Sequence, residues 1–198
     1  MHFCAYTVLL LSCLFAEGPQ STTTFPIPAD MHETWPGAKL NDAENQLLKK
    51  AVESDLRVME KDCDQKTPFE SVNSADLNLG KLGHGILVLM TGSCVCGVTG
   101  GCPIYSYVRE TGGYRKVLGG RRRDPFGWAF AVVSSNTETP DLVIAGNAGG
   151  GHIVLSLYRY DGNAFAPQAC EVLTKKDPDS AASWWDSSQI VVESCAGK

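Results

Sequence analysis

The cysteines around residue 96 are the densest group of potentially reactive side chains in this sequence. Cys94 and Cys96 are separated by one residue, and Cys102 follows after Gly-Val-Thr-Gly-Gly. Thiolates at this spacing are able to ligate zinc or copper, and a pair of them could be redox-active. The motif is C-x-C rather than C-x-x-C, however, and no histidine lies beside it. It favours a structural disulfide loop, with a thiol metal or redox site as the alternative.

A basic stretch next to aromatic residues is a candidate binding surface. Arg121, Arg122 and Arg123 precede Phe126 and Trp128. Guanidinium groups beside aromatic rings suit carboxylates, phosphates or acidic glycans. A solvated turn with one ring tucked beneath it would give the same pattern. If the stretch is functional, we expect the three arginines and Trp128 to contact an anionic ligand or a protein partner.

Two histidines are candidates for acid–base chemistry. His84 lies in Leu-Gly-His-Gly at the entrance of an expected strand, and His152 opens a strand pattern after the glycine-rich stretch 146–151. That stretch predicts a long glycine-rich connection rather than a dinucleotide site, because a strand pattern and not a helix follows it. The sequence has no Gly-x-Ser-x-Gly elbow and no phosphate-loop signature. Structural histidines are therefore favoured over a hydrolase that uses His84 or His152, and neither a cofactor nor a metal is expected.

The N-terminus predicts export. Residues 1–16 are apolar and contain no acid, which is typical of a signal-peptide core and short for a membrane span. The Leu-Leu-Ser-Cys stretch that ends at Cys13 is similar to a bacterial lipobox, so lipid anchoring at Cys13 is an alternative to plain cleavage. We expect a signal over residues 1–18 and a periplasmic, secreted or lipid-anchored protein, with no transmembrane span in the mature chain.

Composition limits the remaining classes. The 198 residues carry a formal net charge of −5, which argues against a protein that binds nucleic acid by neutralising phosphates. The length suits one domain. We expect an exposed lead-in over residues 19–40 and a single disulfide-stabilised β-rich domain over residues 41–198.

Six cysteines remain beyond the signal, an even number that suits three disulfides. Cys94 and Cys96 would point to opposite faces of an extended chain, which gives them different partners. The expected pairs are Cys96–Cys102 across a small ring, Cys170–Cys195 pinning the C-terminal tail, and Cys63–Cys94.

The elements that must position these side chains are one helix and several strands. Asn41 and Glu44 form a capping-box-like start, and apolar residues then recur at helical spacing to Met59. From Gly85 onward, short β-type runs alternate with glycine-rich breaks. The expected strands are Ile86–Met90, Ile104–Arg109, Tyr114–Leu118, Trp128–Ser134, Leu142–Ala145, Ile153–Tyr160 and Ala164–Val172.

Short connections predict antiparallel neighbours. Glu110–Gly113 and Asp161–Asn163 are expected hairpin turns. The fold class is therefore mainly β (α+β), an antiparallel meander forming an open sheet or small sandwich with one N-terminal amphipathic helix. Ser106, Arg109 and Gly112 recur 50 residues later as Ser156, Arg159 and Gly162, which suggests two related strand–loop–hairpin units, with chance similarity as the alternative.

Two weak resemblances accompany this pattern. The stretch from Asp76 through Asn78 to Val88 resembles the degenerate calcium-loop-then-strand pattern of FG-GAP and VCBS-type repeats. Gly80 and Lys81 replace residues of that loop, so the resemblance implies poor calcium binding. The Cys96–Cys102 stretch resembles uncharacterised exported bacterial proteins with a Cys-Gly-x-Thr-Gly-x-Cys core, a likeness that implies no activity.

Together these patterns favour an exported, non-catalytic binding or envelope-associated domain. Its partner would be an unknown protein or an anionic envelope ligand. The alternatives are the exported hydrolase and the thiol metal or redox site.

Overall fold

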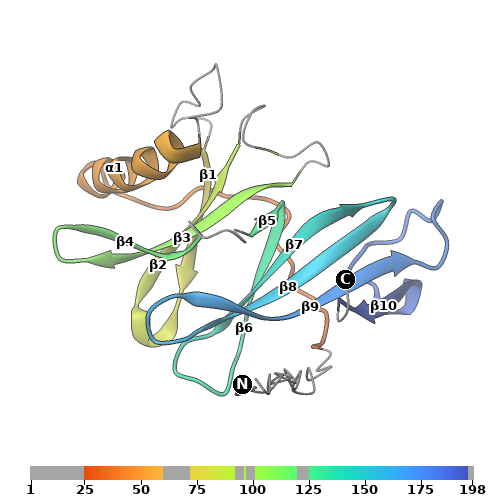
Figure 1. The fold of residues 1–198 in the computed structure, drawn as a ribbon. Helices are drawn as coiled ribbons and strands as arrows, with labels where there is room; N and C mark the ends of the chain where they lie inside the picture. The colour runs from red at the N-terminus through yellow and green to blue at the C-terminus, as the bar shows by residue number, and fades with distance from the viewer. Residues whose placement is uncertain (1–24, 60–71, 92–95, 97–100, 120–124, 196–198) are drawn as a thin grey trace, which may run out of the picture.

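A computed structural model describes residues 25–59, 72–91, 96, 101–119 and 125–195 (Figure 1). The predicted signal with Cys13, the cysteines Cys63 and Cys94, and the arginines Arg121–Arg123 lie outside these residues. The elements are α1 (Asp42–Met59), β1 (Val72–Asn78), β2 (His84–Met90), β3 (Cys102–Glu110), β4 (Gly113–Leu118), β5 (Phe126–Gly127), β6 (Ala129–Val133), β7 (Asp141–Gly149), β8 (His152–Tyr160), β9 (Phe165–Lys175) and β10 (Ile190–Ser194), with short 3-10 turns at Gly80–Leu82 and Ser187–Gln189.

The strands form two antiparallel sheets, which confirms the predicted fold class. The first sheet has the order β1-β2-β3-β4, with β5 paired to β3, and the second has the order β10-β9-β8-β7-β6. Strands that are consecutive in the chain are neighbours in nearly every case. Each sheet is therefore a meander, as the short turns require.

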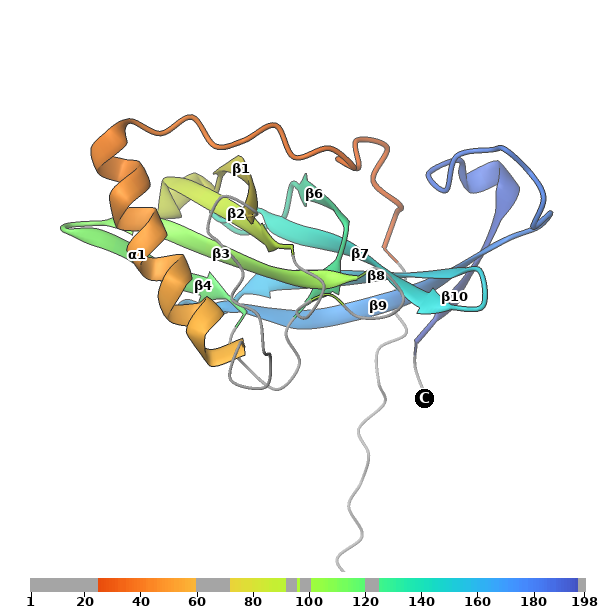
Figure 2. The ribbon, with the colours of Figure 1, turned by 90° about the horizontal axis from the view of Figure 1, so that it is seen from above.

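The two sheets pack against each other, and part of each outer face is also covered. A central core takes Leu87 and Leu89 from the first sheet and Leu142 and Ile144 from the second. The intervening β2 residues, such as Val88, point the other way and pack beneath α1. The outer face of the second sheet has its own apolar cluster. Figure 2 shows the resulting layers, with α1 lying across the first sheet.

Helix α1 begins where the capping pattern predicts. The Glu44 backbone N–H donates to Asn41 Oδ1 at 3.0 Å, and the Asn41 N–H donates to Glu44 Oε2 at 3.2 Å. This reciprocal pair satisfies two backbone donors that the first turn leaves without helical partners. Leu48, Val52 and Leu56 form the buried stripe of the helix.

Residues 25–40 form a strap along both sheets, although the sequence predicts only an exposed lead-in over residues 19–40. The Phe25 N–H donates to Glu171 Oε1 at 2.8 Å on β9. His32 and Phe130 exchange two backbone hydrogen bonds at the edge strand β6. The Gly37 N–H then donates to the Ser74 carbonyl at 2.9 Å on the other edge strand, β1. In Figure 2 the orange trace follows this path to α1.

Two of the three predicted disulfides lie in the described part of the chain, and both are formed. Cys96 is bonded to Cys102, and Cys170 to Cys195. The Cys63–Cys94 pair lies outside the described residues and stays a prediction.

Four features differ from the sequence-based prediction. Three of them are strands that the sequence does not predict: β1, β5 and β10. The stretch 146–151 is not a long connection, because β7 continues to Gly149 and β8 begins at His152. This correction follows from the ladder between the two strands, in which Gly146 pairs with Val154 and Asn147 with Ile153.

The residues that recur at 50-residue spacing lie at corresponding places in the two sheets. Ser106 and Arg109 belong to β3, and Ser156 and Arg159 to β8, each the third strand of a four-strand meander that starts at β1 or β6. Both following turns contain a glycine with positive φ, +84° at Gly112 and +99° at Gly162, as tight hairpins favour.

Candidate functional site

A groove between α1 and β1 is a concave feature that the described residues form. It holds a cavity of about 400 Å³ and lies where α1, which packs over β2 to β4, leaves the outer face of β1 open. The apolar part of its lining comes from the strap, α1 and the first two strands: Ala38, Leu40, Leu48, Val72 and Val88. We call this feature the α1–β1 groove.

The rest of the groove lining is polar. Asn45 and Gln46 lie on one turn of α1 and Lys49 on the next, and Ser74 lies opposite on β1. Ser74 Oγ accepts the Ala38 N–H at 3.0 Å, which fixes the strap at one end of the groove. Leu48 and Val88 are buried, so the polar residues supply much of the surface that the groove exposes.

His84 pairs with a carboxylate on the same face of the first sheet. His84 Nε2 lies 2.9 Å from Asp76 Oδ1, and Asp76 Oδ2 accepts the Lys39 N–H at 3.0 Å. A hydrolytic triad places the histidine between nucleophile and acid. Here the hydroxyl nearest along β1, that of Ser74, lies on the far side of Asp76 and is bonded to the strap. The pair is exposed, with 48% of the His84 side chain accessible, so water is not excluded from it.

His152 has a different partner. Its Nδ1 lies 2.7 Å from Thr174 Oγ1, the residue directly opposite on β9. Within the described ranges, no carboxylate bonds the other ring nitrogen. His84 and His152 lie in different sheets and are not brought together into one site.

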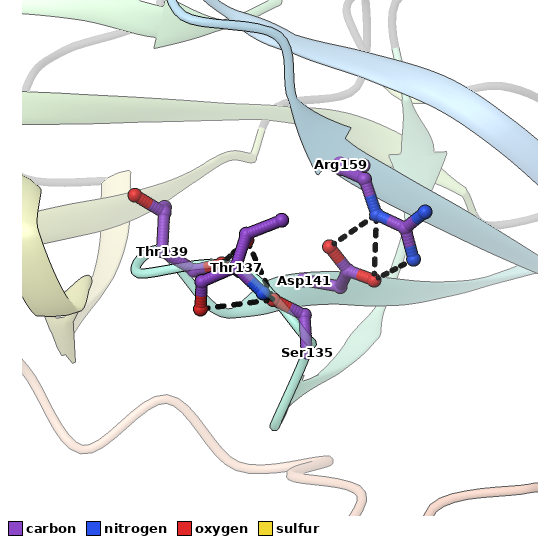
Figure 3. Close-up of polar contacts among 5 residues, drawn as sticks. All are labelled: Ser135, Thr137, Thr139, Asp141 and Arg159. Carbon is purple, nitrogen blue, oxygen red and sulfur yellow. Dashed lines mark hydrogen bonds and ion pairs between the residues drawn. The ribbon is translucent and has the colours of Figure 1, made fainter.

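The repeated arginine of the second sheet makes a forked ion pair. Figure 3 shows that Arg159 on β8 donates hydrogen bonds to Asp141 on β7 through Nε and Nη2. The shortest of these contacts is 2.7 Å. Hydrogen bonding to Asp141 raises the pKa of Arg159. The Asp141 side chain is only 4% exposed, so both of its oxygens depend on this partner. The ion pair joins β7 and β8 through their side chains, and it uses both carboxylate oxygens of Asp141, so this carboxylate is not available as a catalytic base.

The loop before Asp141 is held by its own hydroxyl groups. Ser135 Oγ donates to the Thr139 carbonyl at 2.7 Å, and Thr137 Oγ1 donates to the same carbonyl at 2.6 Å (Figure 3). Ser135 Oγ also lies 2.7 Å from Thr137 Oγ1. These contacts position the β6–β7 connection rather than an accessible nucleophile.

A third polar cluster lies beneath the helix. Asp55 of α1 accepts the Tyr107 hydroxyl at 2.6 Å and also bonds Lys116 of β4. Burial, followed by the nearby Asp55 charge, raises the pKa of Tyr107, which therefore stays protonated. Lys116 also lies over the Tyr105 ring, 5.2 Å from its centroid. These contacts orient α1 on the sheet.

The candidate surface at Arg121–Arg123 and Trp128 is described only in part. Trp128 is half-buried on the outer cluster of the second sheet, with its ring centroid 5.7 Å from that of Trp185. Its carbonyl accepts the Trp35 indole N–H at 3.0 Å. Trp128 is thus held by packing contacts, and its pairing with the arginines stays a prediction.

The remaining candidates concern metals and thiols. Cys96 and Cys102 are joined in a disulfide, so neither sulfur is a thiolate ligand here, and Cys94 lies outside the described residues. The part of the chain that the structure describes contains no group of three histidine, cysteine or acidic side chains suited to a metal ion. No helix among the described residues is long and apolar enough to cross a membrane.

The chain matches no protein-family model, no curated protein and no solved structure. The two resemblances noted from the sequence stay predictions. Asp76 and Asn78, which suggested a degenerate calcium loop, both lie in strand β1, where Asn78 Oδ1 accepts the Gly80 N–H.

The α1–β1 groove is the feature that sequence reasoning missed. The amphipathic helix itself was predicted. The groove depends on β1, which was not predicted, and on the sideways position of α1, which hydrophobic periodicity does not encode.

Proposed function

We propose that this chain is an exported, non-catalytic binding domain that holds a small ligand in the α1–β1 groove. The observation that carries the proposal is the cavity of about 400 Å³ between α1 and β1, which both apolar and polar residues line. Ligand pockets in proteins span roughly 300–1,000 Å³, a range that includes this cavity. The cavity is therefore suited to a small ligand rather than to a folded partner.

The non-catalytic part of the proposal is supported by how the polar groups are used. Asp141 is committed to Arg159, and Asp55 to Tyr107 and Lys116. Such fully bonded groups stabilise a fold, whereas a catalytic site needs a nucleophile, a base and an orienting group around one reacting atom.

One observation favours the hydrolase alternative, namely the His84–Asp76 pair. A carboxylate at 2.9 Å would orient the imidazole as a general base. This candidate has no nucleophile within the described residues in reach of the free ring nitrogen, so it would have to activate water directly.

Binding is tested with N-phenyl-1-naphthylamine, a neutral dye whose fluorescence rises in apolar surroundings. We expect the full chain to take up the dye. Asn45→Trp should abolish uptake, because a large ring at this exposed helix position would fill the groove. Lys50→Trp on the solvent side of the same helix is the matched control and should bind as the wild type does. Equal uptake by both variants would place the dye elsewhere and refute the groove as the binding site.

Catalysis is tested separately with p-nitrophenyl octanoate. We expect no release of nitrophenol above the buffer rate. Turnover that disappears in His84→Gln would overturn the non-catalytic proposal and favour the hydrolase.

Export is tested by fractionating cells that produce the full chain, beside a chain that lacks residues 1–18. Retention of both forms in the cytoplasm would contradict export.

A further inference from the structure

We infer that the start of the strap is a proton-controlled latch: protonated Glu171 holds it against the outer face of the second sheet, and ionised Glu171 releases it. We call residues 25–31 the latch segment. They pack on the second sheet and do not line the α1–β1 groove, so the inference does not depend on the proposed ligand. Its basis is the environment of Glu171, the attachment of the latch segment and the rigidity of the strands beside it.

Glu171 is a buried carboxyl group on an apolar surface. The residue is 1% exposed and pairs across the ladder with Leu155, a member of the outer apolar cluster. Glu171 Oε1 accepts the Phe25 N–H at 2.8 Å, and Oε2 is buried without a hydrogen-bond partner among the described residues. Burial raises the pKa of Glu171, and the hydrogen bond from Phe25 offsets only part of this effect. A neutral carboxyl group is accommodated here, whereas a carboxylate would lack the partners that a buried charge requires.

Among the described residues, no charged group of the neighbouring strands faces Glu171. The residues directly opposite it are Leu155 on β8 and Ser194 on β10. Lys175 lies on the same face of β9, but it is roughly 13 Å away along the strand, and its Nζ donates to a backbone carbonyl of the following turn. Glu193 of β10 points to the opposite face, because side chains alternate along a strand. An ionised Glu171 would therefore have no strand residue to neutralise it.

The titratable groups of the strap and of the turn before β10 do not bond Glu171 either. These residues include Asp30, His32, Glu33 and Asp186. Glu33 accepts the Trp185 indole N–H at 2.7 Å, and the His32 ring lies against an aromatic ring of β6 at a centroid distance of 5.1 Å. Asp30 and Asp186 are exposed to water. The charge state of Glu171 therefore decides whether the latch segment covers a neutral or a charged surface.

The latch segment is attached weakly. Its sequence is Phe-Pro-Ile-Pro-Ala-Asp-Met, and the two prolines have no N–H with which to pair with a strand. Within the described ranges, the Phe25–Glu171 bond is the one hydrogen bond between these residues and the sheet. Apolar contacts of Phe25, Ile27 and Met31 with the outer cluster supply the rest of the attachment. Such a segment opens locally at a smaller cost in free energy than a strand does.

The strands beside Glu171 are held much more firmly. Strand β9 is paired with β8 on one side and with β10 on the other. The Cys170–Cys195 disulfide joins β9 to β10 one residue away from Glu171. Water therefore reaches the carboxylate when the latch segment lifts, rather than when the strands separate. When Glu171 loses its proton to solvent, the buried charge disfavours the docked state, and release of the latch segment hydrates it.

The direction of the pH dependence follows from the two states of Glu171. The docked group has a raised pKa, and the hydrated group of the released state has the ordinary pKa of a glutamate. The equilibrium constant for release is therefore constant at low pH and rises by up to about tenfold per pH unit above the ordinary glutamate pKa. It levels off above the pKa of the docked group. The latch segment is thus docked in acid and is released progressively as the pH rises.

The test is hydrogen–deuterium exchange of the full-length protein between about pH 4 and about pH 8, expressed as protection factors that remove the intrinsic pH dependence of exchange. We expect the protection of the latch segment to fall with rising pH, while the amides of β8 stay protected. Glu171→Gln keeps an oxygen that accepts the Phe25 N–H but cannot ionise, so its protection should not change with pH. Glu193→Gln, at an exposed position of the adjacent strand, is the matched control and should keep the wild-type pH dependence.

A second variant separates the packing of the latch segment from the proton. Ile27→Ala removes apolar contact with the outer cluster and keeps Glu171. Release should become severalfold more favourable at every pH, because less apolar surface is buried in the docked state. The slope of release against pH should stay that of the wild type, and a changed slope would contradict the role given to Glu171.

The outcomes decide the inference in either direction. Protection of the latch segment that does not depend on pH in the wild type would overturn it, and so would an unchanged pH dependence in Glu171→Gln. A parallel loss of protection in β8 would show that the second sheet opens as a whole, which also contradicts a local latch. Loss of the pH dependence in Glu193→Gln would assign the titration to β10 and refute the role of Glu171. Dye uptake by the groove is a separate measurement, so failure of one proposal leaves the other standing.

Discussion

Replacing Arg159 should destabilise the protein far more than replacing Arg109, although the two arginines occupy corresponding places in the two sheets. Arg159 makes three contacts to Asp141, at 3.1, 3.2 and 2.7 Å, and the Asp141 side chain is 4% exposed. Arg109 makes a contact of 2.6 Å to Glu44, whose side chain is 29% exposed.

The expected magnitudes follow from what each substitution leaves behind. Arg159→Ala leaves the buried Asp141 carboxylate without a partner, which lowers the free energy of unfolding by roughly 3–5 kcal/mol where no water can reach the carboxylate. Since 45% of the Arg159 side chain is exposed, water would enter the vacated space, and we expect a loss of about 2–3 kcal/mol. Arg109→Ala leaves Glu44 in contact with water and still bonded to the Asn41 N–H, so the loss should not exceed about 1 kcal/mol.

The assay is urea unfolding followed by tryptophan fluorescence, with all variants at one pH and ionic strength. A slope of about 1–3 kcal/mol per molar urea converts the Arg159→Ala loss into a midpoint shift of about 0.7–3 M. The double variant Arg159→Ala/Asp141→Ala should recover part of this loss, because no buried charge is left without a partner. Equal midpoint shifts for Arg109→Ala and Arg159→Ala would refute the reasoning from burial.

Three further predictions concern stability. Removing the Cys170–Cys195 bridge by paired alanine substitutions should lower the free energy of unfolding by about 3.5 kcal/mol, and removing Cys96–Cys102 should lower it by about 2 kcal/mol. The two bridges span 25 and 6 residues, and a bridge across a longer loop restricts the unfolded chain more. Guanidinium unfolding checks this order, and the reverse order would contradict it. Burial raises the pKa of Glu171, so the native protein keeps this proton to higher pH than the unfolded chain does. The contribution of Glu171 to stability is complete below the ordinary glutamate pKa and is lost as pH rises through the pKa of the folded protein. In Glu171→Gln the melting temperature should therefore fall less steeply with rising pH. An unchanged dependence of the melting temperature on pH would contradict this role of Glu171. Asn41→Ala should cost about 1 kcal/mol in thermal unfolding by removing the helix cap, whereas Asn45→Ala within the helix should not, and equal losses would argue against the capping role.

Much of the fold was accessible from the sequence because its signals are local. The Asn41 cap, the apolar stripe of α1 and the two glycine hairpins each depend on residues a few positions apart. Strand β1 was not predicted because it is an edge strand whose outer face is partly exposed to solvent, and its Asn, Ser and Asp residues are typical of loops. The same Asp and Asn residues made this stretch resemble a degenerate calcium loop.

The candidate site was much less accessible than the fold. The polar half of the groove comes from α1, but its partner Ser74 lies on the unpredicted strand, and the cavity arises from the relative position of helix and sheet. The two histidines of the hydrolase alternative, His84 and His152, are placed in separate sheets by the topology. Motif spacing contains no information on such non-local placement.

The strap has a consequence for the order in which the protein is made. Synthesis delivers residues 25–40 before any strand, yet Phe25 is bonded to Glu171, 146 residues later. The hairpins of each meander form from neighbouring segments and can close early. The strap cannot make all of its contacts until β9 has left the ribosome. The first described segment to be synthesised is thus among the last to dock. A bulky group fused just before residue 25 would delay this final step, while the hairpins would close at their normal rate.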